Sequence, residues 1–339
     1  MAIWAPPAPP IHPMLRPRRP IIVTGPINRM GAACATALER GDRGIPIHGN
    51  GRDGKTWGVE CLAMNASWQP FPVAFFFMDY GKPEKATENY FSATFLETAG
   101  MRTIRHATGA ESMMRACNLL MERTRDLCQE AIAVVINEAN RFTSFEHDHL
   151  VTLDNLLERR KKRAFFILIY QNDAEWGGQQ AIDHRPPTQV TGRFYSMAHQ
   201  FTGLLWGNAN AIDFQGCDVT MAFNEYDEGV IFPDDETGVP CTAYFARNAY
   251  MNGYRLTSQV GLFREVVEDL RVKNHLPAIA PFPMQSFERF VYFLLVRIAG
   301  EDPNFRQFNR EQALKALLWA GYIELELSKH AVVPDDTHR

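Results

Sequence analysis

The sequence has few features of membrane or secreted proteins. No run of eighteen apolar residues, which a membrane-spanning helix needs, occurs among its 339 residues. The first twenty residues contain prolines where the apolar core of a secretory signal peptide would be continuous. We therefore expect a cytoplasmic protein with no membrane partner.

Paired cysteines and an excess of basic charge are also missing. The six cysteines form no CxxC pair, which argues against a zinc ribbon and a disulfide framework and favours buried thiols. The formal net charge of -4 gives no overall attraction for nucleic acid. Binding to DNA would need a local basic strip, repeated by oligomerisation.

The composition does provide for a sizeable core, because 46% of the residues are hydrophobic.

Three regions of the chain differ in composition and in the pattern of apolar residues. Residues 1–20 are rich in proline and arginine and are expected to form a flexible, extended arm. Residues 21–204 predict an α/β nucleotide-binding domain, and residues 205–339 a mainly helical lid or C-terminal domain.

Apolar runs in the first half alternate with helix-like stretches. Strands are predicted at 44–48, 73–79, 131–136 and 164–170, with a fifth at 194–201. Helices are predicted at 28–40, with Asn28 as N-cap, and at 55–65, 85–99, 110–129 and 146–162. This order predicts a parallel sheet flanked by helices.

The second half is predicted to be helical at 243–274, 286–300 and 310–323, with the polar stretch 224–240 as a loop.

The strongest local motif is "GNGRDGKT", which matches GxxxxGK[ST] and stands between a predicted strand and a predicted helix. Backbone N–H groups of such a loop wrap phosphates, its lysine reaches the β and γ oxygens, and its hydroxyl coordinates Mg²⁺. The motif predicts binding of ATP with Mg²⁺ through Gly49, Asn50, Gly51, Arg52, Asp53, Gly54, Lys55 and Thr56.

Polar residues end two further predicted strands. Asn137 and Glu138 follow the apolar run of "AVVINEAN", where the magnesium ion and the attacking water are expected. Asn137 is a candidate metal ligand with Thr56, but it lacks the negative charge of the usual aspartate, which predicts weak hydrolysis. Glu138 is the candidate to polarise water, and Gln171 is a candidate contact for the γ-phosphate.

This order of P-loop, polar strand ends and helical domain resembles an AAA+ ATPase over roughly residues 25–300. Within that superfamily, "GIPIHGNGRDGKT", the stretch from "VVINEAN" to "FFILIYQND", and "GRFYSMAHQFTG" are most similar to transposition regulators of the TnsC, TniB and MuB type. The resemblance implies a ring or helical filament on double-stranded DNA that links a target-selection protein to a transposase.

The resemblance also implies roles for single residues. Arg193 matches an arginine finger that reaches the nucleotide of the adjacent subunit, and Arg255 matches a second sensor on a helix of the lid. Arg102, Arg105 and His106 are the candidates for weak contacts with the DNA backbone.

Two other functions stay open at this point. One is a helicase-loader-like remodeller whose client is another protein. The other is a nucleotide-gated scaffold that binds ATP and hardly hydrolyses it.

Overall fold

The computed structural model describes residues 11–330 except 82–86, 105, 127, 128, 130, 172–187, 208–215 and 235. The chain divides into two compact units. Residues 26–202 belong to one, which we call the sheet unit. Residues 203–328 and the segment that ends at Gly25 belong to the other, which we call the helical unit.

The sheet unit is built on five strands in the order β2-β3-β4-β1-β5, and each neighbouring pair is parallel. The strands are β1 (Gly44–Gly49), β2 (Val73–Asp79), β3 (Ala131–Asn137), β4 (Arg163–Gln171) and β5 (His199–Gln200). The first four are nearly continuous apolar runs because helices cover both faces of the sheet. Their carboxyl ends all meet at one edge of the sheet.

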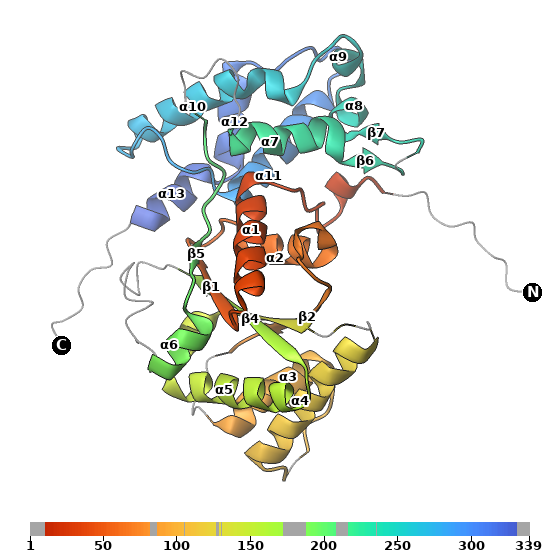
Figure 1. Cartoon of the computed structure of the whole chain (residues 1–339). Coiled ribbons are helices and arrows are strands. Elements are labelled where there is room, and N and C mark those ends of the chain that lie inside the picture. Colours follow the sequence, from red (N-terminus) through yellow and green to blue (C-terminus); the bar gives the residue numbers. More distant parts are fainter. Residues whose placement is uncertain are drawn as a thin grey trace, which may run out of the picture. The chain divides into compact units, whose positions relative to one another are not determined.

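The helices of the sheet unit form two layers (Figure 1). On one face lie α3 (Glu88–Thr98), α4 (Gly109–Asp126) and α5 (Ser144–Arg159), whose apolar side chains share one buried core with β2, β3 and β4. On the other face, α1 (Gly25–Arg40) packs closely against α2 (Lys55–Met64). A Cβ at Gly31 of α1 would lie only 3.0 Å from Leu62 of α2, so glycine permits this approach.

Two boundaries in this unit differ from the sequence prediction. Helix α1 begins at Gly25, so Asn28 lies within the helix and is not its N-cap. Pro26 explains the earlier start, because proline suits the first turn of a helix. The fifth strand was expected at 194–201, but only His199 and Gln200 pair with β1, and Phe194 ends the helix α6 (Thr188–Phe194).

The helical unit contains short helices around a second apolar core. Its α-helices are α7 (Asp218–Asn224), α8 (Cys241–Phe245), α9 (Arg247–Met251), α10 (Val260–Lys273), α11 (Met284–Tyr292), α12 (Arg310–Trp319) and α13 (Tyr322–His330). It also contains the π-helices η6 (Glu225–Gly229) and η8 (Phe293–Ala299) and the 3-10 helices η1 (Pro13–Leu15) and η7 (Leu256–Gln259).

The expected loop at 224–240 carries regular structure. Besides η6, it contains the strands β6 (Ile231–Phe232) and β7 (Val239–Pro240), which form an antiparallel pair. The Asp234 carboxylate accepts hydrogen bonds from the backbone N–H groups of Glu236 and Thr237, and this turn reverses the chain between the two strands.

A flexible, extended arm was expected at residues 1–20. Residues 1–10 lie outside the described part of the chain, and residues 11–20 pack against the helical unit. Met14 is fully buried, and His12 packs against the rings of Phe232, Tyr244 and Phe245. Arg19 forms an ion pair with Glu288 and lies over the ring of Tyr292. Composition alone predicted a flexible segment, but His12, Met14 and Arg19 anchor it, while Ile11 and Leu15 stay exposed.

The expected fold class is confirmed: an α/β parallel sheet flanked by helices, followed by a mainly helical region. In the described part of the chain, no helix combines the length and the apolar character that crossing a bilayer requires.

Candidate functional site

The GxxxxGKT loop connects β1 to α2 at the carboxyl edge of the sheet. Gly54 occupies the N-cap of α2 with φ +102, a left-handed conformation that favours glycine. Arg52 is also left-handed, with φ +68. Gly54 brings no capping side chain to the helix. A helix that begins without a side-chain cap suits a bound anion, because its first N–H groups and its dipole favour negative charge.

Lys55 is held inside this loop. Its side chain is buried, and Nζ donates hydrogen bonds of 2.7 Å to the carbonyls of Gly49 and Asn50. A positive charge is thus fixed in the turn where the motif places phosphate. The same charge acts on the preceding strand, because burial first and the Lys55 ammonium second lower the pKa of His48.

The glycines of the loop allow close approaches to neighbouring strands. A Cβ at Gly49 would lie 2.2 Å from the backbone oxygen of Phe201, just after β5. A Cβ at Gly51 would lie 3.0 Å from Nε2 of Gln171, at the end of β4. Gln171, the candidate contact for the γ-phosphate, therefore stands beside the loop.

The two predicted metal ligands also meet at this edge. Thr56 Oγ1 of α2 donates to Oδ1 of Asn137, at the end of β3, over 3.5 Å. On its other side, Asn137 Nδ2 donates to Oδ1 of Asp79, at the end of β2, over 2.9 Å. The parallel register pairs Asp79 with Asn137 directly. Sequence reasoning missed Asp79, although "VAFFFMD" has the same apolar run ending in a polar residue.

Glu138, the candidate to polarise water, follows Asn137 in a left-handed conformation with φ +60. Its carboxylate lies 3.5 Å from the guanidinium of Arg141, one turn further along the chain. Arg141 also donates to the backbone oxygen of Tyr80 over 3.1 Å. Sequence reasoning did not single out Arg141, which holds Glu138 near the end of β2.

A layer of buried polar groups supports the strand ends. Tyr80 donates to Glu146 over 2.9 Å, and His147 contacts the hydroxyl of Tyr195 at 2.6 Å, which in turn contacts Tyr170 of β4. Burial acts to raise the pKa of Glu146, but hydrogen bonds from Thr143 and Tyr80 hold it below its ordinary value. This layer fixes α5 and α6 against the ends of β2 and β4.

Arg193, the predicted arginine finger, lies in the last turn of α6. Its guanidinium donates to Asn155 Oδ1 over 2.9 Å and lies 3.4 Å from the Asp154 carboxylate, while about a third of the side chain stays exposed (34%). Burial raises the pKa of Asp154, against the opposing effect of Arg43 and Arg193. Arg193 is thus anchored on α5 at the surface of the sheet unit.

Arg255, the predicted second sensor, lies in the helical unit just before η7 and not within a helix. Its guanidinium donates to the backbone oxygens of Tyr250 and Tyr254 and stacks over the ring of Tyr250. Of the candidate DNA contacts, Arg102 and His106 are exposed between α3 and α4. Arg105 lies outside the described residues.

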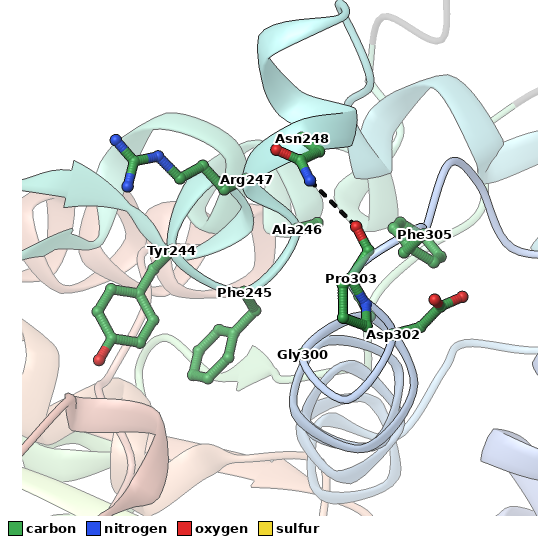
Figure 2. Close-up of a pocket in the computed structure, with 10 residues that line it drawn as sticks. Tyr244, Phe245, Ala246, Arg247, Asn248, Gly300, Asp302, Pro303 and Phe305 are labelled. Carbon is green, nitrogen blue, oxygen red and sulfur yellow. Dashed lines mark hydrogen bonds between the residues drawn. The ribbon is translucent and has the colours of Figure 1, made fainter.

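The helical unit also contains a cavity of about 140 Å³ (Figure 2). Aromatic and prolyl side chains line it, among them Tyr244, Phe245, Pro303 and Phe305. Asn248 Nδ2, at its rim, donates to the backbone oxygen of Pro303 over 3.0 Å. The cavity is below the usual 300–1,000 Å³ of small-molecule sites, so it does not compete with the loop as the nucleotide site.

The chemistry of the carboxyl edge of the sheet, around the GxxxxGKT loop, fits ATP and Mg²⁺. It combines a helix that begins at glycine, a buried lysine, and hard oxygen atoms from Thr56 and Asn137. Hard oxygens are the ligands that Mg²⁺ prefers, and the lysine and helix terminus suit its phosphates.

No protein-family model matches the chain, and no curated protein matches it. Matching solved structures include the Orc1 protein of Aeropyrum pernix in complex with DNA, with 12% identity, coverage of 93% of this chain and 86% of that chain, and a TM-score of 0.39. Cdc6p from Pyrobaculum aerophilum has 10% identity, coverage of 96% and 91%, and a TM-score of 0.40. AMPPCP-bound DnaA from Aquifex aeolicus has 11% identity, coverage of 91% of both chains, and a TM-score of 0.35. These scores, all below 0.5, describe a distant likeness and assign no function.

Proposed function

We propose that this chain is an ATP-binding AAA+ protein in which bound nucleotide controls assembly on double-stranded DNA. One observation carries the proposal. The GxxxxGKT loop joins a central parallel strand to a helix and brings Thr56 within 3.5 Å of Asn137, at the end of another buried strand. Groups suited to bind phosphate and a metal ion therefore lie together at one edge of the sheet.

Different residues at this edge are proposed to bind the phosphates and the metal ion. The backbone of residues 49–54 and the Lys55 ammonium hold the phosphates, and Thr56 with Asn137 would hold Mg²⁺. When bound, Mg²⁺ neutralises charge on the β- and γ-phosphates. Glu138 orients and polarises the attacking water, and Gln171 contacts the γ-phosphate from the end of β4.

For the assembly, we propose a ring or helical filament in which Arg193 acts on the nucleotide of the adjacent subunit. Its partly exposed position on α6 supports this role. We assign the second-sensor role to Arg255. Arg102, Arg105 and His106 are the proposed contacts with DNA phosphates, and summed over many subunits they would offset the acidic net charge of one chain.

The biological role that we propose is regulation of DNA transposition, in which the assembly links a target-selection protein to a transposase. It rests on the resemblance of the P-loop, strand-end and "GRFYSMAHQFTG" segments to the TnsC, TniB and MuB type. For this role we propose a cytoplasmic location.

A second function, a nucleotide-gated scaffold with little turnover, is favoured by two observations. The residue at the usual aspartate position is the neutral Asn137, and the Glu138 carboxylate lies 3.5 Å from Arg141. A carboxylate engaged by an arginine has fewer lone pairs free to orient an attacking water. In this function ATP drives assembly and hydrolysis contributes little to disassembly.

Electron microscopy with duplex DNA tests the proposal. The purified protein is imaged with ATP, with a non-hydrolysable analogue and without nucleotide, alongside Lys55→Ala. We expect rings or filaments that need both DNA and nucleotide and that Lys55→Ala does not form. Isolated molecules under every condition would overturn the assembly function. Equal disassembly rates with ATP and with the analogue would favour the scaffold.

A further inference from the structure

Asp79 has no role in the function proposed so far, yet it directly contacts a predicted metal ligand. It ends β2 beside Asn137 of β3, and the two side chains share a hydrogen bond of 2.9 Å. The Asp79 side chain is exposed at the edge of the sheet.

This contact fixes which end of the Asn137 amide faces the P-loop. An ionised carboxylate only accepts hydrogen bonds, so Asp79 selects the NH₂ end of the amide. The carbonyl oxygen of Asn137 must then point the other way, toward Thr56 Oγ1. Without a carboxylate at position 79, the amide could turn over and present a donor, which cannot ligate a cation.

The contact also places negative charge near the metal position. An amide alone brings none, whereas a carboxylate hydrogen-bonded to that amide polarises it and increases the negative character of its oxygen. The Asp79–Asn137 pair thus carries, over two strands, the charge and the oxygen that one aspartate would carry on β3.

We propose that Asp79 is a positioning residue of the Mg²⁺ site: it aims the Asn137 oxygen at the metal and supplies the charge that Asn137 lacks. This inference rests on the proposed nucleotide site. The competing explanation is that the pair only ties the ends of β2 and β3 together.

Metal binding separates the two explanations. The full chain is titrated with Mn²⁺ in the presence of ATP, and bound metal is followed by electron paramagnetic resonance. Binding of a fluorescent ATP analogue is measured in parallel, with Mg²⁺ and with EDTA. Three variants are compared with the unchanged chain: Asp79→Asn, the exchange Asp79→Asn with Asn137→Asp, and Asp148→Asn. Asp148 is an exposed carboxylate on α5 and serves as the matched control.

For Asp79→Asn we expect metal affinity to fall by about 10- to 100-fold, the range typical of partners that orient a metal ligand. Its nucleotide affinity in EDTA should be unchanged. The exchange variant should recover metal affinity, because it keeps a carboxylate–amide pair and moves the charge next to Thr56. Asp148→Asn should behave like the unchanged chain.

Two results would overturn the inference: unchanged metal affinity in Asp79→Asn, or an equal loss of nucleotide affinity with Mg²⁺ and with EDTA, which a structural role predicts. Failure of the proposed function looks different, because the unchanged chain would then bind no nucleotide in either condition. A thermal melt of each variant checks that it is folded.

Discussion

Replacing Gly49 with alanine should damage the sheet unit, because the new methyl group would collide with backbone. Its Cβ would lie 2.2 Å from the Phe201 oxygen, whereas real Cβ contacts stay beyond 3.0 Å, so the two segments must separate by about 0.8 Å. Phe201 is tied to this strand by a 2.8 Å hydrogen bond from its N–H to the His48 oxygen. The collision therefore pushes β5 away from β1. We expect a loss of about 3 kcal/mol in unfolding free energy, the upper part of the range for overpacked sites.

Gly51→Ala is the matched control in the same loop. Its Cβ would meet only the far end of the Gln171 side chain, at 3.0 Å, and that side chain can rotate aside. We expect a cost below about 1 kcal/mol. Urea denaturation measures both variants, and hydrogen–deuterium exchange assigns the loss to the sheet unit, because the two units need not unfold together. Equal costs for the two variants, or a neutral Gly49→Ala, would refute the collision.

Two further predictions concern the helical unit. Burial, as the largest cause, lowers the pKa of His12 to about 4. In the unfolded chain the imidazole takes up a proton near pH 6.5, so the free energy of unfolding should fall by on the order of 3 kcal/mol between pH 6.5 and 4. The variant His12→Asn keeps an acceptor for the Met14 N–H, so its free energy of unfolding should fall less between pH 6.5 and 4. Denaturation at the two pH values measures this, and an identical fall in variant and unchanged chain would contradict the assignment. Glu326→Ala removes the carboxylate paired with the buried Arg271 and should cost about 3–5 kcal/mol in unfolding free energy. Tyr322→Phe removes only the hydroxyl that accepts a hydrogen bond from Arg271, so its cost should be nearer about 1.5–3 kcal/mol. A larger cost for Tyr322→Phe than for Glu326→Ala would contradict this account.

The long parallel strands could be predicted from the sequence because each is a nearly continuous apolar run. The predicted strand at 73–79 matches β2, and the other three long strands agree to within one residue at each end. Because both faces of these strands are buried, their sequences lack the alternation of apolar and polar residues that marks a strand with one exposed face. The helices between them followed from the same series.

Short elements could not be predicted, because tertiary contacts decide them. Strand β5 has two residues, and its place depends on pairing with β1 and not on its own pattern. The hairpin of β6 and β7 lies in a polar stretch with little apolar signal. The packing of residues 11–20 depends on the aromatic rings around His12, which come from distant parts of the chain.

Within the candidate site, the features that depend on local sequence could be predicted. The turn from β1 to α2 and the polar end of β3 were evident from spacing, and the structure brings Thr56 and Asn137 together. The partners across strands were not evident, because the order of the strands decides which ends are neighbours. Asp79 became visible only when β2 was found beside β3. The roles of Arg193 and Arg255 stay predictions, since both concern assembly or nucleotide state.

Calorimetric titration with ATP and Mg²⁺ tests the central claim most directly, because every proposal depends on nucleotide at the P-loop. The unchanged chain, Lys55→Ala and the control Lys315→Ala, an exposed lysine on α12, are compared. The account predicts binding by the unchanged chain and the control, and an affinity about 10- to 100-fold weaker for Lys55→Ala, the value of a charged hydrogen bond. No binding by the unchanged chain, or equal affinity in Lys55→Ala, would contradict it.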